Sequence, residues 1–434
     1  MWRHRGLDQL GCESLKTHVE LVTIGDELLL GFTVDTNGAY LGRRLAAHGI
    51  SIARRAAVGD AMADIVDAVG QALARTGAVI TTGGLGPTSD DLTRDAIAEL
   101  FGRELRVDDE HLEWMRRRWQ ARFGRDLPAS NVRQAMLPVG ATKLDNAHGS
   151  APGILVEDDR GWVVSLPGVP RELRGMADEV LLPLLDQRGF GSREACIVSR
   201  TLRTTGIAES LLQDQLAAAV PSVARPGDGT TAPSVAYLPG IEGVDLRLTM
   251  RGAGAPAAVD EIARAIRTAI PESIYGEEQT DLAEVLLNAC RRRGVKLCVA
   301  ESCTGGMLGS RITAIPGSSD VFVGGVIAYD NTVKVRHLGV RQADIEAHGA
   351  VSEIVVRQMA VGAQGQCGAD LALAITGVAG PGGGTPEKPV GLVWICAALG
   401  DRVEPRKIHS WGDRNEVRYR AAQAAMDLAR RMLA

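Results

Sequence analysis

The chain has 434 residues, of which 45% are hydrophobic and 23% are charged, a composition typical of a soluble globular protein with two or three domains. The formal net charge of -5 gives no global electrostatic reason to expect nucleic acid or an anionic membrane as the main partner. No apolar run has the length of a membrane span, and residues 1–18 lack the apolar centre of a signal peptide. We therefore expect a cytoplasmic protein in which residues 1–18 form a disordered extension.

The cysteines and histidines point to no disulfide framework and no histidine-based metal site. The 7 cysteines are an odd number without a CxxC pair, and the 8 histidines are scattered singly. Most of the cysteines are expected to be small core residues.

Strand and helix patterns alternate over residues 19–187. The expected strands are residues 20–25, 50–59, 78–84, 153–156 and 162–166, and the expected helices are residues 36–48, 62–75 and 171–185. Such alternation predicts an α/β domain with a parallel sheet covered by helices on both faces.

A glycine-rich loop follows the expected strand at residues 78–84. Its residues Gly83, Gly84, Gly86 and Thr88 would let backbone amides approach phosphate groups. The loop ends in two acidic residues, Asp90 and Asp91, which would bind a hard cation or cap the following helix.

Two further loops follow expected strands in this domain. One carries Asp26 and Glu27 and leads to Asn37, and the other contains Gly168. Because parallel strands end at a common edge, these loops and the glycine-rich loop should meet there.

Arginines and aromatic residues interleave over residues 114–125. The arginines are at 116, 117, 118, 122 and 125, and the aromatic residues are Trp114, Trp119 and Phe123. Nucleic-acid contact is one interpretation. A solvated helix face fits the negative net charge better.

Residues 188–278 have a different order of expected strands and helices from residues 19–187. The expected strands are residues 196–205, 234–240 and 244–252, and the expected helices are residues 208–219 and 257–269. The pattern predicts a small α+β connector before an α/β domain over residues 279–434.

The segment Ala300–Gly309, AESCTGGMLG, lies where a buried strand is expected to turn into a helix beginning at Met307. Ser302 would lie near free backbone amides of residues 303–306, which favour a phosphate or the oxyanion of a tetrahedral intermediate. The alternative is that Ser302 or Thr304 only caps the helix.

The next expected strand ends at Tyr329 and passes into a helix that carries Lys334. At a shared sheet edge Lys334 would approach Ser302, and serine with lysine is a known pairing of nucleophile and base. Acting as a base requires the pKa of Lys334 to fall by roughly three units from about 10.4. Otherwise Lys334 is a solvated helix residue.

Another glycine-rich loop follows an expected strand at residues 369–375. Its amides could enclose an anionic ligand, to which Lys388 would add charge, whereas a flexible surface loop is the competing interpretation. Arg414 and Arg418 lie one turn apart on a last expected helix, where they would hold a phosphate or remain surface arginines.

Five ordered motifs over residues 279–434 resemble the C-terminal domain of the CinA family: ESCTGG, YDNxxK, HGAVSE, TGVAGPGGG and EKPVG. The resemblance implies a nicotinamide mononucleotide (NMN) deamidase that uses no cofactor. Ser302 would be the nucleophile, Lys334 the base, and Tyr329 and Thr376 would line the site. Either Arg414 or Arg418 would bind the phosphate, and Cys303 is a rival nucleophile. The other implied substrate-binding residues are Cys303, Thr304, Gly305, Gly306, Gly377, Gly380, Gly382 and Lys388.

Residues 19–187 resemble the molybdopterin-binding fold of the CinA N-terminal domain, through GDELLxGxxxDTN, TTGGLGPTxDD and LPGVPxE. The resemblance implies an ADP-ribose pyrophosphatase that depends on a divalent metal (Mg, Mn or Co), with K as a further ion. Asp26, Glu27, Asp90 and Asp91 would bind the metal. Residues 188–278 resemble the KH-type connector of the family without a clear GxxG loop, so RNA binding is not expected.

Three functions are compatible with these patterns. The first is a bifunctional enzyme of pyridine-nucleotide salvage acting on NMN and ADP-ribose, which we expect to be a homodimer. The second is an enzyme of the molybdopterin pathway. The third is a competence or damage-response protein with degenerate sites, but every reactive position is filled.

Overall fold

The computed structural model describes residues 18–192, 196–220, 229 and 232–434. Of the expected extension, residues 1–17 lie outside this part, and His18 begins the first strand. The chain forms two compact units, one comprising Met1–Val198 with Arg251–Ala255 and the other Ser199–Met250 with Pro256–Ala434. Each unit is described by itself.

The N-terminal unit is built on a 6-stranded sheet in the order β2-β1-β3-β8-β7-β6. The strands are β1 (His18–Ile24), β2 (Ser51–Val58), β3 (Ala78–Thr82), β6 (Thr142–Leu144), β7 (Gly153–Asp158) and β8 (Gly161–Leu166). The first four in the sheet are parallel, as the alternation predicted. β7 runs antiparallel to β8, because the tight turn between them reverses the chain, and β6 in turn runs antiparallel to β7.

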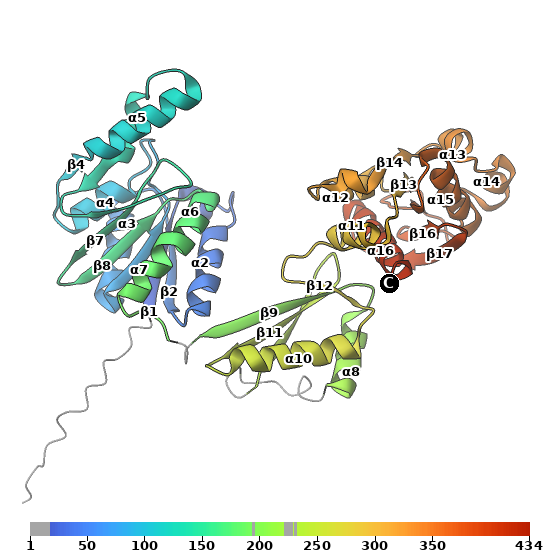
Figure 1. Ribbon diagram of the computed structural model, residues 1–434, viewed down its shortest axis with the longest axis horizontal. Helices are drawn as coiled ribbons and strands as arrows, with labels where there is room; N and C mark the ends of the chain where they lie inside the picture. Colours follow the sequence, from blue (N-terminus) through green and yellow to red (C-terminus); the bar gives the residue numbers. More distant parts are fainter. Residues whose placement is uncertain (1–17, 193–195, 221–228, 230–231) are drawn as a thin grey trace, which may run out of the picture. The chain divides into compact units, whose positions relative to one another are not determined.

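Helices cover both faces of this sheet, as Figure 1 shows. The helices of this unit are α1 (Asp26–Leu29), α2 (Thr36–Ala47), α3 (Met62–Thr76), α4 (Thr93–Leu100), α5 (Asp109–Phe123), α6 (Pro170–Met176) and α7 (Leu182–Gln187). Side chains of α2, α6 and α7 share one core with the sheet, and those of α3 and α4 share the other. The expected helix at residues 171–185 is interrupted by a π-helical turn, Ala177–Leu181.

Shorter elements complete this unit. They are β4 (Leu105–Val107), the 3-10 helix η1 (Ala129–Ala135) and β5 (Met136–Pro138). β4 and β5 form a separate antiparallel ladder beside α5.

The described part of the connector is a 4-stranded sheet in the order β10-β11-β9-β12 with the helices α8 and α10. Its elements are β9 (Ile197–Thr204), α8 (Glu209–Ala219), β10 (Ser234–Pro239), β11 (Val244–Arg251), α10 (Ala255–Ala269) and β12 (Ile274–Glu277). Val244, Leu246 and Leu248 alternate along β11 and are buried, so one face of the sheet supplies the core. The α+β prediction is confirmed.

The C-terminal domain has a 5-stranded sheet in the order β14-β13-β15-β16-β17. The strands are β13 (Leu297–Glu301), β14 (Phe322–Ile327), β15 (Leu371–Gly377), β16 (Leu392–Leu399) and β17 (Arg402–His409). β14, β13 and β15 are parallel, whereas β16 and β17 are antiparallel. Three strands therefore bring their carboxyl ends to one edge.

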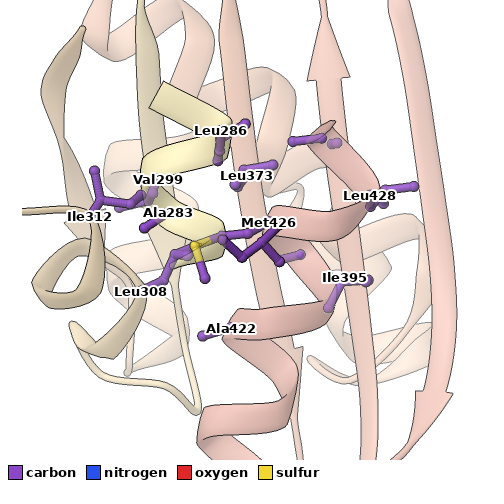
Figure 2. Close-up of a cluster of buried hydrophobic side chains, with 14 of the residues drawn as sticks. Ala283, Leu286, Val299, Leu308, Ile312, Leu373, Ile395, Ala422, Met426 and Leu428 are labelled. Atoms are coloured by element: carbon purple, nitrogen blue, oxygen red, sulfur yellow. The ribbon is translucent and has the colours of Figure 1, made fainter. Parts of the chain in front are cut away.

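Two helical layers enclose this sheet. The helices are α11 (Leu282–Arg293), α12 (Met307–Thr313), η3 (Ser318–Asp320), α13 (Asn331–Leu338), α14 (Gln342–His348), α15 (Glu353–Cys367) and α16 (Arg414–Met432). Figure 2 shows Leu286 of α11, Leu308 of α12 and Met426 of α16 packed against the sheet residues Val299 and Leu373. Side chains of α13, α14 and α15 form the opposite core. Two packed cores fix the sheet edge where the polar residues gather.

Candidate active sites

Ser302 is fixed between two strand ends in the C-terminal domain. Its backbone N–H donates to the carbonyl of Ile375 at the end of β15, at 2.9 Å. On the other side, Ala328 N–H, just after β14, donates to the carbonyl of Glu301 at 2.8 Å. Ser302 is almost buried, with 9% exposure.

Glu301, which the sequence analysis did not single out, ties this turn to α12. Its side chain is 1% exposed. One carboxylate oxygen accepts from the backbone N–H groups of Gly306 and Leu308, each at 3.0 Å, and the other accepts from Gly309 at 2.8 Å. An acidic residue at the end of a buried apolar strand was the signal, because a buried carboxylate needs donors.

These three hydrogen bonds to the Glu301 carboxylate, the Glu301 clamp, change which backbone amides can face an oxyanion. Since the Gly306 N–H donates to Glu301, the prediction that it faces an oxyanion is wrong. The Gly305 N–H donates to the carbonyl of Ser302 at 3.1 Å. Within the described chain, the amides of Cys303 and Thr304 remain as candidate donors to an oxyanion.

Neither Ser302 nor Thr304 caps α12. The N-cap residue is Gly306, which has a left-handed backbone and no side-chain capping hydrogen bond. The Thr304 hydroxyl is buried and has no hydrogen-bond partner. The alternative of a simple helix cap is therefore excluded for both residues.

Lys334 is buried rather than solvated, with 1% exposure on α13. Its amine donates to the carbonyls of Ala328 at 2.8 Å and Tyr329 at 3.1 Å. Burial lowers the pKa of Lys334, and the nearby charge of Asp330 opposes this shift only in part. Because Ala328 is also bonded to Glu301, the amine lies one hydrogen-bonded peptide away from the Ser302 turn.

Cys303 has a poor environment for a nucleophilic thiolate. Burial, with a smaller contribution from the charge of Glu301, raises the pKa of the Cys303 thiol to about 12, although the residue's own backbone N–H and the charges of Arg414 and Arg418 oppose the shift in part. Since the thiolate is the reactive form, almost none is present near neutral pH. Chemistry thus favours Ser302 over the intrinsically better nucleophile.

Thr376 and Lys388 both hold the loop between α14 and α15. The Thr376 hydroxyl donates to the carbonyl of Ala350 at 3.0 Å, and the Lys388 amine donates to the carbonyl of His348 at 2.5 Å. Both residues therefore secure the HGAVSE segment at the sheet edge.

The two arginines of α16 have different partners. Arg418 directs Nη2 and Nε to the carbonyl of Thr304, at 2.6 and 3.2 Å. Arg414 donates from Nη2 to the Tyr329 hydroxyl at 2.9 Å and from Nη1 to the Gly380 carbonyl at 2.6 Å. Arg418 supports the Ser302 turn, whereas the exposed Arg414 bridges two strand ends.

A cavity of about 360 Å³ lies beside Arg414. It is lined by the glycine-rich loop and the start of α16, including Gly380, Pro381 and Asn415. Two other predicted glycines do not line it. Gly377 lies in β15, where a Cβ would approach the Val393 side chain to 2.7 Å, and a Cβ on Gly382 would meet open space.

The three predicted loops of the N-terminal unit enclose a cavity of about 490 Å³. Among its lining residues are Glu27, Asn37, Gly83, Gly84, Gly86, Asp90, Asp91 and Gly168. Asp26 and Thr88 lie next to it but do not line it. The shared sheet edge thus brings these loops together as predicted.

Two glycines of this cavity cannot be replaced without clashes. Gly83 has a φ of 106°, and a Cβ there would lie 2.1 Å from the Ile24 carbonyl oxygen. Gly84 has a φ of 66°, and its Cβ would lie 2.2 Å from the Thr93 hydroxyl. The loop is therefore built from bare backbone, which suits close approach to a phosphate.

Asp91 shapes the loop with both of its carboxylate oxygens. It accepts from the Gly86 N–H at 2.7 Å, from the Thr88 N–H at 2.8 Å and from the Thr88 hydroxyl. A cation would have to compete with these bonds for Asp91.

Asp60, also missed in the sequence, joins the acidic residues at the mouth of this cavity. It accepts from the Asp26 N–H at 2.9 Å and donates its own N–H to Asp26 at 3.1 Å. Burial raises the pKa of Asp60, and the carboxylates of Asp26, Glu27 and Asp90 add to the effect. The described residues nevertheless contain no group of three or more His, Cys, Asp or Glu side chains placed to hold a metal by themselves.

Arg94 lies buried behind the glycine loop. Its Nη2 donates to the Leu85 carbonyl at 3.0 Å, its Nε has no partner, and burial lowers its pKa to about 10. Helical spacing to Ile97 places it on the buried face, which was the available sequence signal.

Three family models match successive parts of the chain. They are described as "Probable molybdopterin binding domain" over residues 20–187, "Damage-inducible protein CinA KH domain" over residues 199–276 and "CinA C-terminal domain" over residues 279–433. A CinA-like protein of Gemmatimonas aurantiaca is 54% identical over 420 residues, covering 96% of each chain. The chain belongs to the CinA family.

A second relative agrees with this assignment. A "Putative competence-damage inducible protein" of Halothermothrix orenii is 41% identical over 94% of this chain and 96% of its own length. The crystal structure of a competence/damage inducible protein from Agrobacterium tumefaciens is 37% identical and covers 34% of this chain and 90% of that one, with a TM-score of 0.33.

The three-part α/β architecture expected from the motifs is thereby confirmed. None of the helices in the described part of this CinA chain has the length and apolarity needed to cross a bilayer.

Proposed function

We propose that the C-terminal domain deamidates NMN to nicotinic acid mononucleotide and ammonia. The observation that supports this most is the buried Lys334 amine beside the Ser302 turn. Burial lowers its pKa, as a general base requires. Its two backbone carbonyl partners orient the amine, and the charge of Asp330 offsets the effect of burial only in part.

The reaction follows from the groups at the sheet edge. Neutral Lys334 takes the proton of the Ser302 hydroxyl as its oxygen attacks the carboxamide carbon. The N–H groups of Cys303 and Thr304 stabilise the oxyanion. The amide C–N bond breaks as Lys334 returns the proton to the leaving ammonia, and water then hydrolyses the ester on Ser302.

This proposal requires a hydrogen bond between Ser302 and Lys334 when substrate is bound. In the structure the Lys334 amine instead donates its hydrogen bonds to the carbonyls of Ala328 and Tyr329. Catalytic hydrogen bonds often tighten only in the substrate complex.

Arg414 is the better candidate for the substrate phosphate. It is exposed and lines the cavity beside the glycine-rich loop, and it donates to Tyr329. Arg418 is less exposed and does not line this cavity, and its Nε and Nη2 donate to the Thr304 carbonyl of the Ser302 turn. The α16 N-terminal amides of Asn415 and Glu416 are occupied by the Asp413 side chain, so the guanidinium must supply the contact.

A second activity, hydrolysis of ADP-ribose to AMP and ribose 5-phosphate, is proposed for the N-terminal unit. The supporting observation is the bare-backbone loop at Gly83 and Gly84 with carboxylates at its mouth. Of the predicted loop amides, those of Gly83, Gly86 and Thr88 already donate to Leu166 and Asp91. The Gly84 amide therefore remains as the candidate donor to the diphosphate, and buried Arg94 would add positive potential behind it.

A divalent cation (Mg, Mn or Co), with K as a further ion, fits this cavity as a partner of the substrate. Asp60, Asp26, Glu27 and Asp90 crowd negative charge together, which a cation would relieve. Cations such as Mg²⁺ commonly bind one or two carboxylates together with substrate phosphates. Such an ion would neutralise the diphosphate and orient a water molecule.

One experiment tests both activities. The purified protein is incubated with NMN and with ADP-ribose, with and without divalent metal, and ammonia and AMP are measured. Ammonia from NMN that does not depend on metal, and AMP that does, are expected. No ammonia from NMN would overturn the deamidase proposal. A pterin that stabilises the protein against heat more than ADP-ribose would favour the molybdopterin-pathway alternative.

Assembly as a homodimer is part of the proposal. Light scattering of the purified protein tests it, and the mass of a single chain would contradict it.

A further inference from the structure

A separate cavity of about 370 Å³ lies beside helix α5 in the N-terminal unit. The sequence predicted a solvated face here, yet Trp114, Trp119 and Phe123 of this helix line the cavity. Figure 1 shows α5 at the margin of the unit. Cavities of this size fall within the range of about 300–1,000 Å³ found for small-molecule sites.

The aromatic side chains form surfaces on which a flat ring can stack. The ring centroids of Trp119 and Phe123 are 4.5 Å apart, and Phe123 remains 47% exposed. The Trp119 indole N–H is buried without a hydrogen-bond partner and is therefore available to donate to a ligand. Such surfaces bind nucleobases because every base has a π face.

Guanidinium groups accompany these rings. Arg118 lies 5.1 Å from the Trp114 ring centroid, and Arg122 lies 5.3 Å from that of Phe123. Together with Arg171, both arginines line the cavity. Aromatic faces combined with cations favour a planar heteroaromatic ring that carries phosphate.

This cavity adjoins the one at the glycine loop. Val169 and Glu172 line both cavities. Glu172 accepts from the Asn146 amide at 2.7 Å, which fixes its carboxylate between them. A ligand with its diphosphate at Gly83 and Gly84 can therefore extend past Glu172 toward Trp119.

We propose that the α5 cavity binds the purine base of a nucleoside diphosphate whose phosphates lie at the glycine loop. The base stacks on Trp119 and Phe123, and a carboxylate such as Glu172 accepts hydrogen bonds from the sugar hydroxyls. The inference rests on the proposed function only in that the glycine loop takes phosphate groups.

Binding of AMP and of ribose 5-phosphate tests the proposal, because the two ligands differ only in the base. Calorimetry on the full-length protein should give at least about tenfold tighter binding of AMP. Trp119→Ala should remove that preference, whereas Gln120→Ala, an exposed neighbour outside the cavity, should keep it. Equal affinities for the two ligands in the unaltered protein would overturn the proposal.

A second pair of variants covers a failure of Trp119→Ala to fold. Arg118→Ala should weaken AMP binding several-fold, and Arg117→Ala, whose side chain does not line the cavity, should not. Tighter binding of a single-stranded oligonucleotide than of AMP would overturn the proposal in favour of a nucleic-acid surface. If Trp119→Ala or Arg118→Ala changed the molecular mass of the protein in solution but left its AMP affinity unchanged, the proposal would be overturned in favour of a contact between copies of the chain at α5.

The outcomes separate this inference from the pyrophosphatase proposal. A Trp119-dependent preference for AMP without ADP-ribose hydrolysis would support the base site and reject the activity. ADP-ribose hydrolysis without a preference for AMP over ribose 5-phosphate would support the activity and reject the base site.

Discussion

The carboxylate of Glu301 accepts a hydrogen bond from the backbone N–H of Gly309 at 2.8 Å. The backbone N–H groups of Gly306 and Leu308 donate two further hydrogen bonds to the same carboxylate. The last residue of β13 is thereby bonded to the first turn of α12, with Ser302 between them. The position of the proposed nucleophile thus depends on a buried side chain that takes no part in the bond changes.

Glu301→Gln should loosen this turn. The glutamine side chain presents an NH₂ group where a carboxylate oxygen accepted, so at least one amide loses its partner. The loss of a hydrogen bond to a charged group costs about 1.5–3 kcal/mol of stability. We expect a lower melting temperature and a kcat for NMN deamidation reduced by more than about tenfold.

The exposed acidic residue Glu284 provides the control for this change. Glu284→Gln should alter neither the melting temperature nor kcat. If Glu301→Gln behaved in the same way, the clamp would have no part in positioning Ser302.

Ser302→Ala should abolish NMN deamidation, because the proposed ester forms on the Ser302 hydroxyl. Cys303→Ala should retain it, since burial raises the pKa of the Cys303 thiol to about 12 and leaves it protonated. Ammonia release from NMN measures both variants. Full activity of Ser302→Ala together with loss in Cys303→Ala would reverse the assignment.

Lys334→Met keeps the length of the side chain and removes the amine. A positioned proton-transfer group contributes about 100- to 10,000-fold in rate, so kcat should fall by that amount. NMN binding should change little, because the amine acts on the nucleophile. A tenfold weaker affinity with unchanged kcat would instead make Lys334 a binding residue.

The pH dependence of deamidation should report the neutral form of Lys334. Burial lowers its pKa below the usual 10.5, so activity should rise as pH increases through that lowered value. Stability has the same sign. Between the folded and unfolded pKa values the unfolded chain binds the extra proton, and unfolding becomes less favourable as pH rises. Activity that falls with rising pH below 10 would contradict a lysine base.

Arg414→Ala and Arg418→Ala should change different kinetic parameters of NMN deamidation. Loss of Arg414 should raise the KM for NMN at least about tenfold with a smaller change in kcat, because a phosphate contact acts in both ground and transition states. Loss of Arg418 frees the Thr304 carbonyl and should lower kcat and the melting temperature. Steady-state kinetics and thermal unfolding distinguish the two, and the opposite pattern would exchange their roles.

Local patterning predicted much of the fold. The apolar strands around Ser302 and the glycine loop at Gly83 were evident, because period and turn residues are local properties of the chain. The antiparallel strands β16 and β17 were not predicted, since strand direction depends on partners far along the chain.

The sequence by itself determined the family, the three-part architecture and which reactive side chains follow the ends of strands. Tertiary structure decided what surrounds them: the burial that lowers the pKa of Lys334, the clamp of Glu301 and the different partners of Arg414 and Arg418. The physical reason is that burial, hydrogen-bond partners and electric field at a side chain come from residues distant in sequence, which only the packed chain brings together.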